Sequence, residues 1–152
     1  MIHNILLADS NCSLLAFHET LLLDAGYRVA VATSTEAILG QLGSTAYSLV
    51  IAELGYAGYR EKEDLDWIRR ARRLRPGTPI LILTSNSLPA AHREARALGV
   101  WEVRVKPTLW PELLSLVENI LEDAYAQRGL RPGHLPGTSA ARMETWVETE
   151  VE

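Results

Sequence analysis

The chain has 152 residues, of which 47% are hydrophobic and 22% are charged, so it can build one ordinary globular core and is too short for two. Its formal net charge of -4 does not favour a general attraction to nucleic acids or anionic lipids. Cys12 is the single cysteine, which excludes an intramolecular disulfide and argues against a cysteine-based zinc site. The N-terminus lacks the basic start of a signal peptide, and its apolar run ends at Asp9, so we expect a cytoplasmic protein.

Five short runs of branched apolar residues recur along the chain and predict β-strands. They span residues 5–8, 29–32, 49–52, 80–83 and 100–105. Such near-continuous apolar runs are typical of strands that are buried on both faces, as in a parallel sheet between two layers of helices. The runs at 49–52 and 80–83 show this most clearly.

Segments with the apolar spacing of helices separate these runs. The first such segment begins near Leu14 and is stopped by Gly26, a residue suited to the left-handed turn after a helix. For the second, Thr33 with Glu36 forms the pattern of a capping box. Both signals predict short helices that cross between neighbouring strands.

Three further helices are expected in the second half of the chain. The third spans residues 64–74, where the apolar residues recur at helical spacing. Ser87 with Pro89 opens the fourth, which Gly99 closes. Thr108 opens the fifth, which carries a strong apolar stripe.

The regular alternation of strand and helix predicts a doubly wound parallel α/β sheet in one domain, residues 1–126. Residues 127–152 differ in composition. They begin with a linker rich in Gly and Pro and end in a tail that mixes apolar and acidic residues. The spacing of the tail fits a weak amphipathic helix or an alternating strand, and we expect it to dock on the domain or on a second chain.

Polar residues follow the ends of four of the predicted strands. They are Asp9 with Ser10 after the first, Glu53 after the third, Thr84 after the fourth and Lys106 after the fifth. In open parallel sheets the ligand crevice lies beyond the carboxyl ends of the strands. We therefore expect these side chains to meet in one crevice.

This pattern resembles the receiver domain of two-component response regulators, over roughly residues 3–122. The resemblance implies a flavodoxin-like fold, with a five-stranded parallel sheet in the order 2-1-3-4-5 and five helices. In that family an acidic pair after the first strand holds Mg²⁺, an Asp ending the third accepts phosphate, and a Thr or Ser and a Lys-Pro hold the phosphoryl oxygens. Asp9, Thr84 and Lys106-Pro107 stand at matching positions.

Three positions depart from the family pattern. Ser10 replaces the second acid, which removes a charged oxygen ligand for Mg²⁺. Glu53 replaces the phosphoacceptor Asp, and its extra methylene displaces the carboxylate, which in-line phosphoryl transfer tolerates poorly. Val103 replaces the Tyr or Phe that switches with phosphorylation. We expect no cofactor, or only weakly bound Mg²⁺ at Asp9 and Glu53.

The leading hypothesis is a pseudo-receiver, which is not an enzyme and acts through protein–protein contacts of its fourth helix, fifth strand and fifth helix. An ionised Glu53 paired with Lys106 would partly imitate the phosphorylated state, although simple loss of the acceptor explains the residues equally well. Trp101, Val103 and Trp110 mark the expected interface. Expected partners are a histidine kinase, an output protein, a regulator or a second copy, and neither nucleic acid nor a membrane.

Two alternatives stay open. One is a weakly active, Mg²⁺-dependent receiver that is phosphorylated on Glu53 or Asp9. The other is a flavodoxin-like binder of FMN or a nucleotide, which the lack of a Gly-rich loop after the first strand argues against. The arginine-rich stretch 69–75 is interpreted as a solvated helix face, because acidic residues precede it. Cys12 is interpreted as a half-buried packing residue rather than a reactive thiol.

Overall fold

The computed structural model describes residues 2–53, 61–84, 89–106 and 108–127. Ten elements alternate along these residues: β1 (Asn4–Ala8), α1 (Cys12–Asp24), β2 (Arg28–Ala32), α2 (Thr35–Ser44), β3 (Leu49–Glu53), α3 (Glu61–Leu74), β4 (Ile80–Thr84), α4 (Pro89–Ala97), β5 (Glu102–Val105) and α5 (Trp110–Gln127). The strands form one parallel sheet in the order β2-β1-β3-β4-β5. The predicted fold class and strand order are therefore confirmed.

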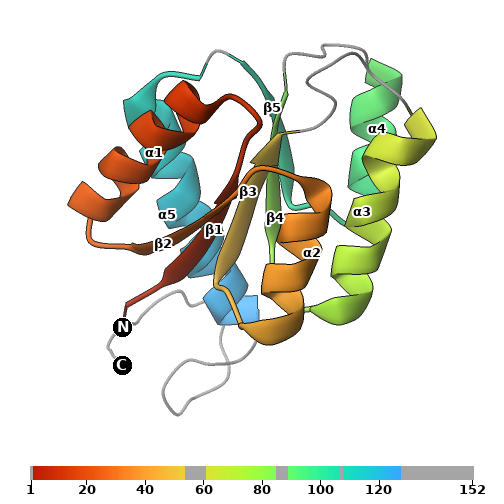
Figure 1. The fold of residues 1–152 in the computed structure, drawn as a ribbon, viewed down its shortest axis with the longest axis horizontal. Helices are drawn as coiled ribbons and strands as arrows, with labels where there is room; N and C mark the ends of the chain where they lie inside the picture. Colours follow the sequence, from red (N-terminus) through yellow and green to blue (C-terminus); the bar gives the residue numbers. More distant parts are fainter. Residues whose placement is uncertain (1, 54–60, 85–88, 107, 128–152) are drawn as a thin grey trace. The chain divides into compact units, whose positions relative to one another are not determined.

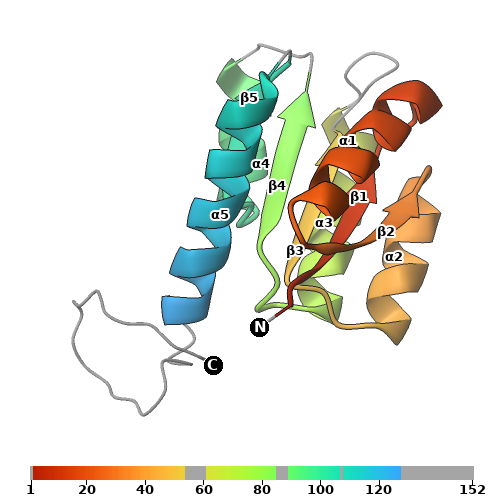
Figure 2. The ribbon, with the colours of Figure 1, turned by 90° about the vertical axis from the view of Figure 1, so that its left-hand side faces the viewer.

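The sheet and the first four helices belong to one compact unit, Ile2–Leu113. Within it, α1 lies on one face of the sheet, and α2, α3 and α4 lie on the other (Figure 1 and Figure 2). From Leu114 onward α5 belongs to a second unit. Its buried residues keep helical spacing, as predicted: Leu113, Val117, Ile120, Leu121 and Ala124. None of the helices in the described part of the chain is long and apolar enough to cross a membrane.

Position in the sheet decides how completely each strand is buried. The three inner strands are buried on both faces at residues 5–8, 49–52 and 80–84. The two outer strands are partly exposed, and Val31 of β2 and Val105 of β5 have 37% and 41% of their surface exposed. The near-continuous apolar runs therefore mark the inner strands, as the sequence predicted.

The main hydrophobic core lies between the sheet and the layer of α2, α3 and α4. Successive strand residues point to opposite faces, so Leu6, Val50 and Ile82 share one face. They form one cluster with Ile38 of α2 and Ile68 of α3, both nearly inaccessible to solvent. Burying an aliphatic side chain of this size contributes about 1.5–3 kcal/mol. This packing fixes the strands whose ends carry the polar residues.

Capping residues set the bounds of α1. The helix starts at Cys12, and its N-cap is Asn11, whose Oδ1 accepts the N–H of Leu14 at 3.0 Å. It ends before Gly26, which adopts a φ of 99° as predicted for a left-handed turn. Gly99 follows α4 with a φ of 97°. The sequence therefore predicted the ends of these two helices better than the start of α1.

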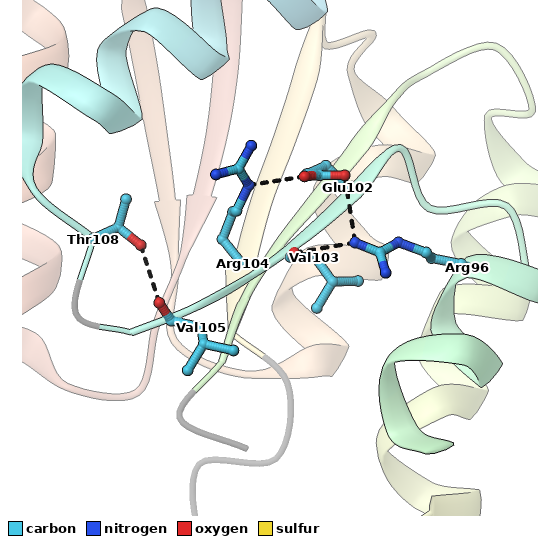
Figure 3. A network of polar contacts seen from close by, with 6 residues as sticks. All are labelled: Arg96, Glu102, Val103, Arg104, Val105 and Thr108. Carbon is cyan, nitrogen blue, oxygen red and sulfur yellow. Dashed lines mark hydrogen bonds and ion pairs between the residues drawn. The ribbon is translucent and has the colours of Figure 1, made fainter. Parts of the chain in front are cut away.

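The predicted starts of α2 and α5 are wrong in detail. The N-cap of α2 is Ser34 rather than Thr33, and its hydroxyl oxygen accepts a backbone N–H of the first turn at 3.1 Å. Thr108 does not cap α5, because its hydroxyl donates to the carbonyl oxygen of Val105 at 3.4 Å (Figure 3). The helix begins at Trp110 instead.

Smaller differences affect α3, α4 and β5. α3 begins at Glu61, three residues before its predicted start. α4 begins at the predicted Pro89, and Ser87 lies outside the described residues. β5 begins at Glu102, two residues later than predicted. None of these differences moves the strand ends at which the polar residues lie.

Candidate functional site

Three of the predicted site residues meet through their side chains beyond the carboxyl ends of the strands. Lys106 Nζ lies 3.1 Å from Asp9 Oδ2 and 3.4 Å from Glu53 Oε1. Asp9 and Glu53 follow Ala8 and Ala52, which pair directly between β1 and β3. Lys106 follows β5, two strands away from β3, so its long side chain is needed to reach the acids. We call these three residues the crevice cluster.

Asp9 is the ionised acid of the crevice cluster. Its Oδ1 accepts the backbone N–H of Asn11 at 2.9 Å, and its Oδ2 accepts a hydrogen bond from Lys106. Burial alone would raise the pKa of Asp9, but hydrogen bonds from Glu53, Asn11 and Lys106 outweigh it, so that the pKa is lowered. Asp9 therefore holds its negative charge around neutral pH.

Glu53 behaves differently, although it is only one strand away. Burial, the hydrogen bond to Asp9 and the negative charge of Asp9 raise the pKa of Glu53 to about 7, and Lys106 opposes this only in part. The two carboxyl groups therefore share a proton, which Glu53 carries. The predicted pair with Lys106 is present, and with a pKa of about 7 Glu53 is only partly ionised near neutral pH.

Thr84 and Ser10 occupy the predicted positions at the strand ends. Thr84 is fully buried, and its carbonyl oxygen accepts the backbone N–H of Lys106 at 2.7 Å. This bond fixes the backbone from which the lysine side chain extends. Ser10 is half-buried directly after Asp9. The structure thus joins Asp9, Glu53 and Lys106 through side chains, and it ties Thr84 to Lys106 through the backbone.

His18 belongs to the surroundings of the cluster, a position that the sequence did not predict. It is 8% exposed, on the inner side of α1 between Leu15 and Leu22. Burial lowers the pKa of His18, while the charge of Asp9 raises it and that of Lys106 lowers it further. Its spacing of three and four residues from the two leucines was the signal that placed it on the inner side.

Asn11 has a role that the sequence did not predict, and Cys12 differs from its sequence interpretation. Asn11 both caps α1 and donates its backbone N–H to Asp9, so it links the helix start to the cluster. An Asn three residues before Leu14 is a typical N-cap, and this was the available signal. Cys12 is exposed, so its interpretation as a half-buried packing residue is wrong.

A resident Mg²⁺ fits this arrangement poorly. The two acids expected to hold it, Asp9 and Glu53, share the ammonium group of Lys106 as their counter-ion. Ser10 adds a neutral hydroxyl where a third charged ligand would be needed. Across the residues that the structure describes, no group of three His, Cys, Asp or Glu side chains could hold a metal ion.

The residues expected at an interface divide into two kinds. Trp101 and Trp110 are partly exposed. Val103 is only 4% exposed and belongs to the main core, because the alternation along β5 turns it toward α4. A surface role for Val103 is therefore wrong for this structure. Its small side chain fills core space and does not reach the surface.

A second polar cluster joins α4 to β5 at the edge of the sheet (Figure 3). Arg96 of α4 donates to the carbonyl oxygen of Val103 at 3.3 Å and pairs with Glu102 Oε1 at 3.5 Å. Arg104 Nε lies 2.8 Å from Glu102 Oε2. We call Arg96, Glu102 and Arg104 the edge cluster. It covers an outer strand with charged groups, which protects such strands from pairing with other chains.

Several solved structures with this fold are described as response regulators or receiver domains. A receiver domain protein (CheY-like) from Methanospirillum hungatei aligns with a TM-score of 0.77 and 19% identity, over 84% of this chain and 99% of that one. A response regulator from Burkholderia pseudomallei, solved with a phosphorylated aspartic acid, a calcium ion and citrate, aligns with a TM-score of 0.67 and 22% identity, over 84% of this chain and 74% of that one. The fold is therefore the CheY-like, flavodoxin-like receiver fold.

Sequence similarity points the same way. The chain is 30% identical to the transcriptional regulatory protein ZraR of Salmonella typhimurium over 140 aligned residues. The aligned region covers 92% of this chain. It spans only 30% of the length of that relative. No protein-family model matches the chain. Together with the structural neighbours, this relative supports the assignment of the chain as a response regulator receiver-like signalling domain.

Proposed function

We propose that this chain is a regulatory module that acts without phosphorylation, through contacts with partner proteins. The observation that carries the proposal is the position of Lys106, whose Nζ bridges Asp9 at 3.1 Å and Glu53 at 3.4 Å. The lysine neutralises the acids from within the chain, at the place where receivers of the resembled family hold Mg²⁺. Within the crevice cluster, the charge of Lys106 is paired with the two acids of the same chain.

The chemistry of Glu53 supports the same proposal. A carboxyl group attacks phosphorus only when it is ionised, and the pKa of Glu53 is raised to about 7 by burial and by Asp9. Its longer side chain also displaces the carboxylate from the position of an aspartate, and small misplacements cost large factors in rate. Protonation and geometry therefore both oppose phosphoryl transfer to this residue.

The edge cluster and its neighbours form the surface at which we place the partner. Arg96 holds α4 against the carbonyl oxygen of Val103 in β5, so this surface is formed without a phosphorylation event. Partly exposed Trp101 and Trp110 supply aromatic groups, which together with arginine are enriched at protein interfaces. A histidine kinase, an output protein or another regulator fits this role, and so does a homodimer through α4, β5 and the start of α5.

Incubation with acetyl phosphate and Mg²⁺ tests the proposal. We expect the intact mass of the full chain to stay unchanged, because Glu53 is partly protonated, is longer than an aspartate and is paired with Lys106. The Glu53→Asp variant is the matched control, since it restores the acceptor type at the same position. Stoichiometric gain of a phosphoryl group on any carboxylate of the unmodified chain would overturn the proposal.

The double variant Ser10→Asp with Glu53→Asp probes how much of the ancestral site remains. Tryptophan fluorescence during a Mg²⁺ titration reports binding, because the chain has four tryptophans. A saturable change in the double variant would show that these two substitutions removed the metal site. If the double variant stays silent, restoring the acids at these two positions is not sufficient for Mg²⁺ binding.

A weakly active, Mg²⁺-dependent phosphoacceptor is the second candidate function. The structural neighbour from Burkholderia pseudomallei carries a phosphorylated aspartic acid and a calcium ion, and the raised pKa of about 7 leaves part of Glu53 ionised at neutral pH. This candidate predicts slow labelling that increases with pH and disappears in the Glu53→Gln variant. The mass experiment, repeated on either side of neutral pH, separates the two candidates.

A further inference from the structure

The outer side of α1 exposes large apolar side chains. Phe17 and Leu23 are 55% and 49% exposed, while the inner side of the helix buries Leu15, His18 and Leu22. Phe17 is the one phenylalanine of the chain, and it lies outside while the adjacent histidine lies inside. Phenylalanine is usually more deeply buried than histidine, so α1 shows the opposite of the usual arrangement. The outer side of α1 therefore has the character of a contact surface.

The charges on α1 are all acidic. The helix contains Glu19 and Asp24 and no lysine or arginine. Asp24 is exposed at the last residue of the helix, where the macrodipole already places partial negative charge. Cations from outside the helix would relieve this repulsion. We define the α1 surface as Phe17, Leu23 and Asp24, two exposed apolar side chains with an exposed acid at the helix end.

The C-terminal half of α3 has the opposite character. Arg69, Arg70 and Arg73 are exposed at spacings of three and four residues, at which like charges repel along a helix. Leu74 beside them is 46% exposed. Asp66 is the one acid on the exposed side among the described side chains of α3. We define the α3 surface as Arg69, Arg70, Arg73 and Leu74, a basic patch with an exposed leucine.

The other arginines of this stretch already have structural roles. Arg72 donates to the carbonyl oxygen of Pro76 at 2.9 Å, and Arg75 donates to the carbonyl oxygen of Leu42 at 2.8 Å. They close the end of α3 and tie it to α2. The three arginines of the α3 surface are instead exposed, where they can meet acidic groups of another molecule.

α1 and α3 lie on opposite faces of the sheet, so one copy of the chain cannot bring the two surfaces together (Figure 1 and Figure 2). We propose that the chain associates with itself head to tail, with the α1 surface of one copy bound to the α3 surface of the next. The two surfaces complement each other in charge, and each adds exposed apolar groups to the contact. Unlike surfaces in contact produce closed rings or open chains of copies.

Sedimentation velocity of the full chain over a concentration series tests this association. We expect the sedimentation coefficient to rise with concentration, and to rise less at high salt, because salt screens the charge complementarity. Phe17→Ser removes the aromatic group of the α1 surface, and Arg73→Glu reverses a charge of the α3 surface. Each change is expected to weaken self-association by about thirtyfold or more, as for removal of an interface hot spot.

Mixing the two variants identifies the head-to-tail geometry. The Phe17→Ser copy keeps an intact α3 surface, and the Arg73→Glu copy keeps an intact α1 surface. An equimolar mixture is therefore expected to form a complex of two copies and nothing larger. Far-UV circular dichroism checks that both variants fold. Ile2→Ser before β1 and Glu36→Lys on α2 are the matched controls, because both residues are exposed and lie outside the α1, α3 and α4–β5 surfaces. Both variants are expected to associate like the original chain.

Three results would overturn the proposal. The first is that the original chain stays monomeric over the whole concentration series, which would mean that the two surfaces do not bind each other. The second is that either variant alone associates like the original chain, which would indicate a contact between like surfaces or a dimer through α4 and β5. The third is that the mixture of the two variants, both of them folded, fails to form the complex of two copies.

Discussion

The crevice cluster and the edge cluster use the same kinds of side chain at similar distances, but they differ in burial. The ion-pair distances are 3.1 and 3.4 Å in the crevice and 2.8 and 3.5 Å at the edge. Asp9 and Glu53 have 7% and 9% of their side-chain surface exposed, whereas Arg104 has 50%. The pKa values of the acids are shifted in the crevice cluster, and the difference from the edge cluster lies in burial rather than in distance.

The two clusters differ because water solvates the charges at the edge far better than those in the crevice. At the edge, water and salt screen each charge, so a pair with good geometry adds little stability. In the crevice, an acid that loses its partner stays in a poorly solvated place. It can then only take up a proton or destabilise the fold. The following predictions test this contrast, from the largest expected effect to the smallest.

Lys106→Met should have the largest effect. It removes the cation that both Asp9 and Glu53 contact and leaves a methionine of similar length. We expect a loss of about 2–3 kcal/mol in the free energy of unfolding near pH 8, measured by urea denaturation. Near pH 5 the loss should be smaller, because Glu53 can then neutralise itself by protonation.

Arg104→Met is the matched control, since it removes a cation from the edge cluster. It should change the free energy of unfolding by less than about 1 kcal/mol at either pH. Equal losses for the two variants, or a Lys106→Met loss that does not depend on pH, would show that burial does not separate the two clusters.

The sequence predicted the fold through the inner strands. At residues 49–52 and 80–83 almost every side chain is apolar, and only burial on both faces explains such runs. Helix starts were predicted less well, because Thr33 and Ser34 both suit a cap and backbone geometry chooses between them. The start of α1 at Cys12 was missed because its capping residue, Asn11, lies outside the apolar pattern.

For the candidate site, the sequence predicted which residues share the sheet edge but not their ionisation. Strand order alone brings Asp9, Glu53 and Lys106 to one edge. Which acid carries the proton depends on burial and on differences of a few tenths of an ångström, which no spacing encodes. Lys106 lies closer to Asp9 than to Glu53, and Asn11 adds a further hydrogen bond to Asp9. The negative charge therefore stays on Asp9.

Glu53→Gln tests the proton shared in the crevice. In the folded chain the pKa of Glu53 is raised from 4.5 to about 7, so folding takes up a proton between these values. The stability that this proton contributes is complete below about pH 4.5 and is lost as the pH rises through about 7. Glutamine mimics the protonated acid and cannot ionise. Near pH 8 we expect Glu53→Gln to be more stable than the original chain by on the order of 2 kcal/mol.

The comparison uses the difference between the two proteins at each pH, because the pKa of His18 is also shifted, downward from its ordinary value of 6.5. The lowered pKa of His18 contributes stability above about pH 6.5 that is lost as the pH falls, and it does so in both proteins. Asp9, with its lowered pKa, loses its contribution only in more acidic solution. A difference between the proteins that stays constant from about pH 5 to 8 would contradict the raised pKa of Glu53.

Glu102→Gln should have the smallest effect, although it breaks two ion pairs. Both pairs of Glu102 are at the surface, where Arg96 and Arg104 have 48% and 50% of their side chains exposed. Freed guanidinium groups are solvated at little cost, and Arg96 keeps its bond to the carbonyl oxygen of Val103. We expect a change below about 1 kcal/mol in the free energy of unfolding, and it should shrink further with added salt. A loss as large as that of Lys106→Met would mean that the edge cluster holds α4 in place.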